Sequence, residues 1–108
     1  MFAAADLSTA APPYGQVRGV ADIDRIFRDI HADIASAQSR AELTRLYRRA
    51  GYLVTLTYSR PWRAKFGAAL PGMRDEAARE FRASVEQINQ RAEAIGTDAT
   101  YAQRWGAR

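Results

Sequence analysis

Residues 39–67, SRAELTRLYRRAGYLVTLTYSRPWRAKFG, decide how the rest of the chain is organised. Ser39 and Glu42 form a capping box, in which the serine oxygen accepts from a free backbone N–H and the glutamate reaches back, so a helix is predicted to start here. Apolar residues then recur at spacings of three and four, which predicts one buried helical face. This face comprises Leu43, Leu46, Tyr47, Ala50, Leu53, Val54 and Thr57.

Gly51 introduces an alternative, because glycine commonly follows the last residue of a helix. Residues 52–58 are rich in β-branched and aromatic side chains and alternate as a strand would. However, glycine inside a helix costs only about 1 kcal/mol relative to alanine, and no other segment offers a strand partner. We therefore predict a helix that continues to about Tyr58. A strand at 52–58 would instead have to pair across a dimer.

Two further long helices are predicted on either side of this one. The first begins at Val17 or Val20 and ends near Ala37, with a buried stripe of Val20, Ile23, Ile26, Phe27, Ile30 and Ile34. The connection at 37–39 is short, so the first two helices should be antiparallel neighbours. The last long helix begins at Pro71 or Arg74 and ends at Ile95, with a buried line of Ala77, Phe81, Val85, Ile88, Ala92 and Ile95. The remaining residues of these helices are predicted to face solvent, including Asp24, Arg74, Glu76, Arg79, Glu80, Gln87 and Arg91.

A short helix is predicted between the second and third long helices. Ser59 would cap it, Pro61 lies near its start, and Pro71-Gly72 would stop it near Leu70. Residues 1–16 are small, proline-containing and nearly uncharged, which predicts a flexible N-terminal arm. Tyr101 and Trp105 should lie on a last short helical turn. The predicted fold class is all-α, a small antiparallel helical bundle of three main helices plus a short helix, in a single domain at 17–108.

The composition argues against several kinds of site. The chain has no cysteine, which excludes disulfides and thiolate metal sites. It has no apolar run long enough to span a bilayer and no recognisable secretory signal, so a cytoplasmic location is expected. His31, the only histidine, lies at the edge of the apolar stripe, and neither Asp24 nor Asp33 stands at the i,i+4 spacing of a helical metal pair. We therefore predict no metal, no cofactor, no catalytic residue and no enzymatic activity.

Positive charge is concentrated in the central stretch. Residues 40–65 contain seven basic side chains and one acidic side chain, in a chain whose net charge is +4. Trp62 and Phe66 stand at i,i+4 among these basic residues. They could cap the core of the bundle, or they could form part of a binding surface.

The predicted function is that of a non-catalytic accessory or adaptor protein. Its partner would be a protein with an acidic surface, including a second copy of the chain, since tryptophan, tyrosine and arginine concentrate binding energy at interfaces. The alternative is nucleic-acid binding through the same arginine-rich stretch, although the compact recognition helix of a helix-turn-helix unit is missing. The candidate binding residues are Arg45, Arg48, Arg49, Tyr52, Leu56, Arg60, Trp62, Arg63 and Phe66.

Overall fold

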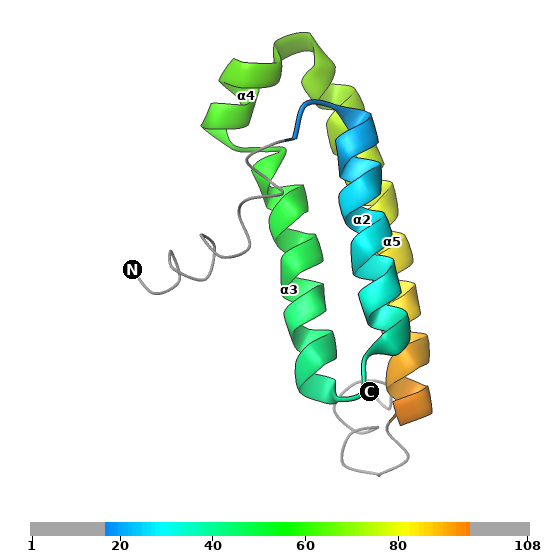
Figure 1. The fold of residues 1–108 in the computed structure, drawn as a ribbon. Helices are drawn as coiled ribbons and strands as arrows, with labels where there is room; N and C mark the ends of the chain where they lie inside the picture. The colour runs from blue at the N-terminus through cyan, green and yellow to red at the C-terminus, as the bar shows by residue number, and fades with distance from the viewer. Residues whose placement is uncertain (1–16, 96–108) are drawn as a thin grey trace.

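The structure is a computed structural model that describes residues 17–95. It contains α2 (Val20–Ser36), α3 (Arg40–Leu56), α4 (Arg60–Phe66), the 3-10 turn η1 (Gly67–Ala69) and α5 (Leu70–Ile95). α3 runs antiparallel to α2, and α5 returns along the bundle in the same direction as α2 (Figure 1). The predicted all-α bundle, with three long helices and a short helix between the second and third, is therefore confirmed. The predicted N-terminal arm and the turn with Tyr101 and Trp105 lie outside the described residues.

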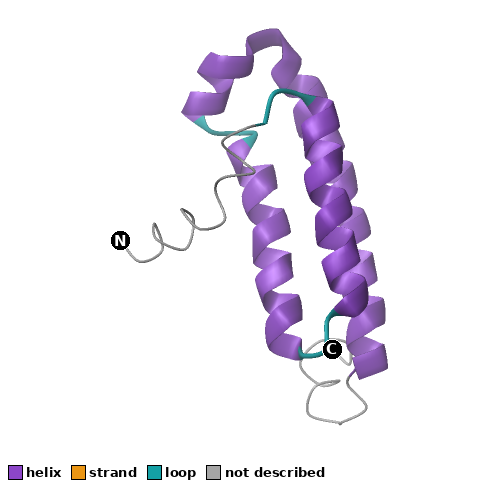
Figure 2. Cartoon of the chain, in the orientation of Figure 1, coloured by secondary structure: helices purple, strands orange, loops and turns teal. Residues whose placement is uncertain are grey.

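α3 passes through Gly51 without a break, so residues 52–56 are helical and the strand alternative is wrong for them (Figure 2). The predicted cap is present, because the Glu42 backbone N–H donates to Ser39 Oγ over 3.2 Å. The Glu42 carboxylate accepts from the backbone N–H of Gln38 over 2.5 Å. The return bond of the capping box therefore reaches one residue further back than predicted.

Gly51 to alanine is expected to raise the free energy of unfolding by about 1 kcal/mol, because alanine is the better helix former. A Cβ at this position would meet only Phe81 Cε1, at an ordinary contact distance of 3.7 Å. Urea denaturation followed by circular dichroism measures the change. Gly67 to alanine is the matched control and should destabilise, because Gly67 has a φ of +51°. A less stable Gly51 variant would contradict the expectation.

The connection from α4 to α5 differs from the prediction. α4 ends at Phe66, Gly67 turns the chain, and α5 starts at Leu70. Pro71 therefore lies in the first turn of α5, where the backbone N–H that proline lacks would have no helical partner in any case. The prediction that Pro71-Gly72 ends the short helix near Leu70 was wrong.

The core lies where α2, α3 and α5 face one another. Its fully buried side chains include Ile23, Phe27, Ile30, Ile34, Leu43, Leu53, Met73 and Ile88. The buried faces were predicted correctly in outline, but Val20 and Tyr47 are 40% and 44% exposed and Phe81 and Val85 are only half-buried. Tyr47 lies at the edge of its helical face, where its ring packs beside that of Phe81 at a centroid distance of 5.7 Å.

Two arginines of α5 bind the carboxyl ends of the other long helices. Arg74 donates from Nε and Nη2 to the carbonyl of Thr57 over 3.2 and 2.8 Å, and Arg91 donates to the carbonyl of Ala37 over 2.9 Å. Carbonyls at the end of a helix have no partner inside that helix, so these bonds satisfy them. The prediction that Arg74 and Arg91 simply face solvent was therefore wrong.

Candidate functional site

Four of the predicted arginines form an exposed surface over α3 and α4. Arg45 and Arg48 are exposed on α3, and Arg60 and Arg63 are exposed on α4 together with Lys65. We call these five residues the basic face. Within the described part of the chain, no carboxylate lies within 4.0 Å of them. Among residues 17–95, no ion pair therefore neutralises their positive charge.

Arg49, which was predicted to belong to the same surface, lies at its border. Its Nη1 is 3.4 Å from Oδ2 of Asp33 on α2, and the side chains are 30% and 56% exposed. An exposed ion pair of this kind contributes up to about 1 kcal/mol. Arg49 thus joins α3 to α2 in addition to bordering the basic face.

The predicted aromatic and apolar members of the surface pack inward. Trp62 is only 8% exposed, and its ring meets that of Phe66 edge-on at a centroid distance of 5.1 Å. Phe66, Tyr52 and Leu56 are half-buried and pack against the core. The structure therefore supports the core alternative for Trp62, whose ring is covered in this conformation.

Two tyrosines that the sequence analysis did not select are the exposed aromatics of this region. Tyr47 is 44% and Tyr58 is 57% exposed. Tyr47 lies on α3, and Tyr58 lies in the turn that follows the C-terminal end of that helix. The guanidinium of Arg74 covers one face of the Tyr58 ring at 4.2 Å. Helical spacing puts Tyr47 at the edge of the apolar stripe, and this position could have identified it as partly exposed.

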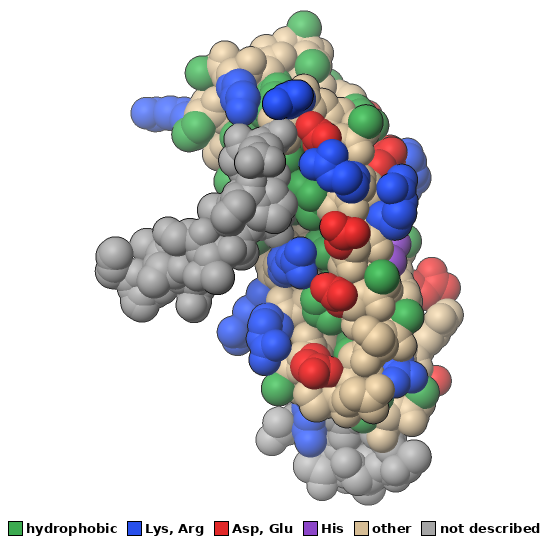
Figure 3. Space-filling model, viewed as in Figure 1, with side chains coloured by type: hydrophobic (Ala, Val, Ile, Leu, Met, Phe, Trp, Pro, Cys, Tyr) green, Lys and Arg blue, Asp and Glu red, His purple; other side chains and the backbone are tan. Residues whose placement is uncertain are grey.

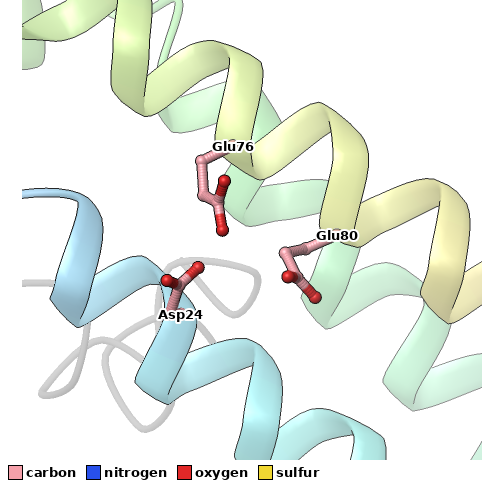
Figure 4. A group of neighbouring side chains, drawn as sticks. All are labelled: Asp24, Glu76 and Glu80. Atoms are coloured by element: carbon pink, nitrogen blue, oxygen red, sulfur yellow. The ribbon is translucent and has the colours of Figure 1, made fainter.

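A second cluster lies between α2 and α5, on a surface that the sequence analysis assigned to solvent. Oxygen atoms of Asp24, Glu76 and Glu80 all lie within 4.8 Å of one another, and Figure 4 shows the three carboxyl groups turned toward a common point. We call these three residues the acidic seam. Glu76 is 7% exposed, so its predicted place on the outward face was wrong. Because α5 packs against both α2 and α3, more of its circumference is buried than a one-sided helix would bury.

The environment of the acidic seam raises the pKa of Glu76. The largest cause is a hydrogen bond with Asp24, followed by burial of the carboxyl group, while the nearby Arg79 lowers the pKa. At the N-terminus of the same helix as Asp24, the pKa of Asp22 is lowered, chiefly because its carboxylate accepts the backbone N–H of Arg18 over 2.7 Å.

Ser84, His31 and Glu80 are the residue types of a hydrolase triad, but their geometry does not form one. His31 Nε2 meets both Ser84 Oγ, at 2.9 Å, and Glu80 Oε1, at 3.7 Å. In a triad, the serine and the acid contact different ring nitrogens. Ser84 is also completely buried, so its hydroxyl cannot reach a substrate.

The acidic seam has the oxygen donors that a hard divalent cation prefers. However, Glu76 is already paired with Arg79, and the neighbouring Asp24 together with burial raises the pKa of its carboxyl group. The spacing of carboxylates within one helix gives no signal for this group. Asp24 and Glu76 are 52 positions apart and meet only through the packing of α2 on α5.

Comparison with known proteins gives no assignment for this chain. No protein-family model, curated protein or solved structure matches it. Within residues 17–95, no helix combines the length and apolar character that crossing a membrane requires.

Proposed function

We propose that this chain is a non-catalytic accessory or adaptor protein that binds an acidic partner protein through the basic face. The observation that carries the proposal is the exposure of five cationic side chains on α3 and α4, none of which has a carboxylate within 4.0 Å in the described part of the chain. Figure 3 shows basic side chains over this part of the molecule, and a row of acidic side chains next to them. Such a surface attracts and orients a negatively charged partner.

Exposed tyrosines favour a protein over a single-stranded nucleic acid as the partner. Proteins that bind single strands stack the bases on open aromatic rings. Here the ring of Trp62 is covered, and Arg74 occupies one face of Tyr58. Tyr47 and Tyr58 are exposed and can still supply contact area, as tyrosines commonly do at protein interfaces.

Reversing two charges, with Arg48 and Arg63 both changed to glutamate, is expected to weaken partner binding by about tenfold or more, because like charges then face the acidic partner. Both side chains are exposed, so the variant should fold normally. The measurement is fluorescence anisotropy with a labelled glutamate-rich peptide. Arg82 to glutamate is the matched control, since Arg82 is exposed on α5, a helix that contributes no residue to the basic face. Equal weakening by both variants would show a general effect of charge and would contradict the proposal.

Nucleic-acid binding is the second candidate, and it is distinguished by salt and by nuclease. Phosphate contacts release counterions, so this binding weakens steeply as salt rises. The tagged chain, with its double-reversal variant beside it, is used for a pull-down from native lysate with and without nuclease. A defined protein that is retained after nuclease and lost by the variant supports the adaptor function. Recovery that vanishes with nuclease supports the second candidate.

A second copy of the chain is one partner of the required charge. Asp29 and Asp33 are exposed on α2, so these two carboxylates of one molecule could face the basic face of another. The solution mass over a range of protein concentrations tests this pairing. A dimer that the double reversal dissociates would identify the partner as the chain itself, whereas a monomer at every concentration would leave a different protein as the partner.

A further inference from the structure

We propose that Asp24 and Glu76 share one proton in the folded chain, and that loss of this proton as the pH rises weakens the contact between α2 and α5. This inference does not depend on the proposed function. It concerns a pH-sensitive device inside the bundle, on residues that the basic face does not include.

The geometry favours a proton between the carboxyl groups of Asp24 and Glu76, whose oxygen atoms lie within 4.8 Å of each other. Glu76 is 7% exposed, and Oδ1 of Asp24 is buried and has no hydrogen-bond donor among residues 17–95. A carboxylate can only accept, so two ionised carboxylates in contact leave each other unsatisfied and repel. One proton turns Glu76 into a donor, and its O–H then donates to Asp24. Carboxyl groups that share one proton are known where like charges lie too close together for both to ionise.

The surrounding charges do not replace this proton. Arg79 pairs with Glu76 and lowers its pKa, but the guanidinium side chain is 63% exposed, and the effects of Asp24 and of burial, which raise the pKa, are larger. Glu80 adds repulsion from the same helix, and His31 faces Glu80 from α2 at 3.7 Å. The charged groups that act on Glu76 thus come from α2 and α5, and the charged side chains of α3 are not among them.

The direction of the pH effect follows from proton linkage. The pKa of Glu76 is raised above its ordinary value of 4.5, so the folded chain binds more protons than the unfolded chain above that pH. Stability from the shared proton is complete below about pH 4.5 and is lost as the pH rises through the raised pKa. The lowered pKa of Asp22 acts in the opposite direction and in a separate window, because its stabilisation is lost as the pH falls below 3.8.

Urea unfolding from pH 4.5 to 8.5 tests the proposal on the wild-type chain and on Glu76→Gln. The unfolding constant of the wild type should rise with pH, by up to about tenfold per pH unit where one proton is released. The glutamine N–H can donate to Asp24 at every pH, so this rise should be missing from the variant. Glu80→Gln is the control on the same helix and should keep the rise. Parallel profiles for the wild type and Glu76→Gln would overturn the proposal.

Two further measurements cover the cases in which Glu76→Gln does not fold or a metal ion takes the place of the proton. If Glu76→Gln does not fold, the side-chain carboxyl signals of ¹³C-labelled wild-type protein should show one glutamate that titrates well above the others, and the absence of such a glutamate would overturn the proposal. Manganese chloride at pH 7.5 tests for a metal in place of the proton. Stabilisation of the wild type by Mn²⁺ that Glu76→Gln abolishes would mean that a cation joins the carboxylates, and it would also overturn the proposal.

Discussion

Replacing Phe27 with alanine is expected to lower the free energy of unfolding by about 3–5 kcal/mol, the cost typical of removing a buried phenylalanine ring. Phe27 is the largest of the completely buried side chains in the described part of the chain. It lies on α2, which packs against both α3 and α5, so the cavity would open at the centre of the bundle. Urea denaturation followed by circular dichroism measures the change.

The expected loss is a large share of the total stability of a small domain, which is about 5–15 kcal/mol. Val20 to alanine is the matched control, because Val20 is on the same helix but 40% exposed. It should change the free energy of unfolding by less than about 0.5 kcal/mol. A Phe27 variant as stable as this control would show that the packing of α2 described above is incorrect.

Replacing Trp62 with alanine is expected to cost about 3–5 kcal/mol as well. Trp62 is 8% exposed, and its ring packs edge-on against Phe66. Trp62 is the only buried residue of the short helix α4. Loss of the ring should therefore release α4 from the end of the bundle. The measurement is thermal and urea denaturation of the variant beside the wild type.

The result separates two roles for Trp62. If Trp62 were a binding residue on the surface, its replacement would leave the free energy of unfolding nearly unchanged and would weaken only the binding of the partner. Tyr58 to alanine is the matched control, because Tyr58 is 57% exposed next to α4. This control should weaken partner binding more than it lowers stability. If the Tyr58 variant instead lost stability and the Trp62 variant lost only partner binding, Tyr58 would belong to the core and Trp62 to the surface.

The basic face was largely predictable from sequence. Helical spacing placed Arg45 and Arg48 away from the apolar stripe of α3, and both are exposed. The aromatic residues were less predictable. An i,i+4 pair such as Trp62 and Phe66 can face either solvent or the core, because the spacing indicates only that the two residues lie on the same side of their helix. The direction of that side depends on how α4 lies over the ends of the long helices.

The acidic seam could not be predicted from the sequence. Asp24 and Glu76 are 52 positions apart, and each appears on the polar side of its own helix. They meet because α5 runs in the same direction as α2 and in one particular register (Figure 1). A shift by one residue along either helix would rotate the carboxyl group by about 100° and separate the pair.

The sequence by itself determined which segments are helices, where Ser39 and Ser59 cap them, and which face of α3 carries the arginines. These features depend on interactions between residues a few positions apart, and such interactions are present whatever the rest of the chain does. Only the tertiary structure decided that Trp62 is buried, that Arg74 binds the end of α3, and that Glu76 lies against Asp24. Each of these depends on the direction and register of helices distant in the chain, because burial and the resulting pKa are properties of the packed surface and not of the helix alone.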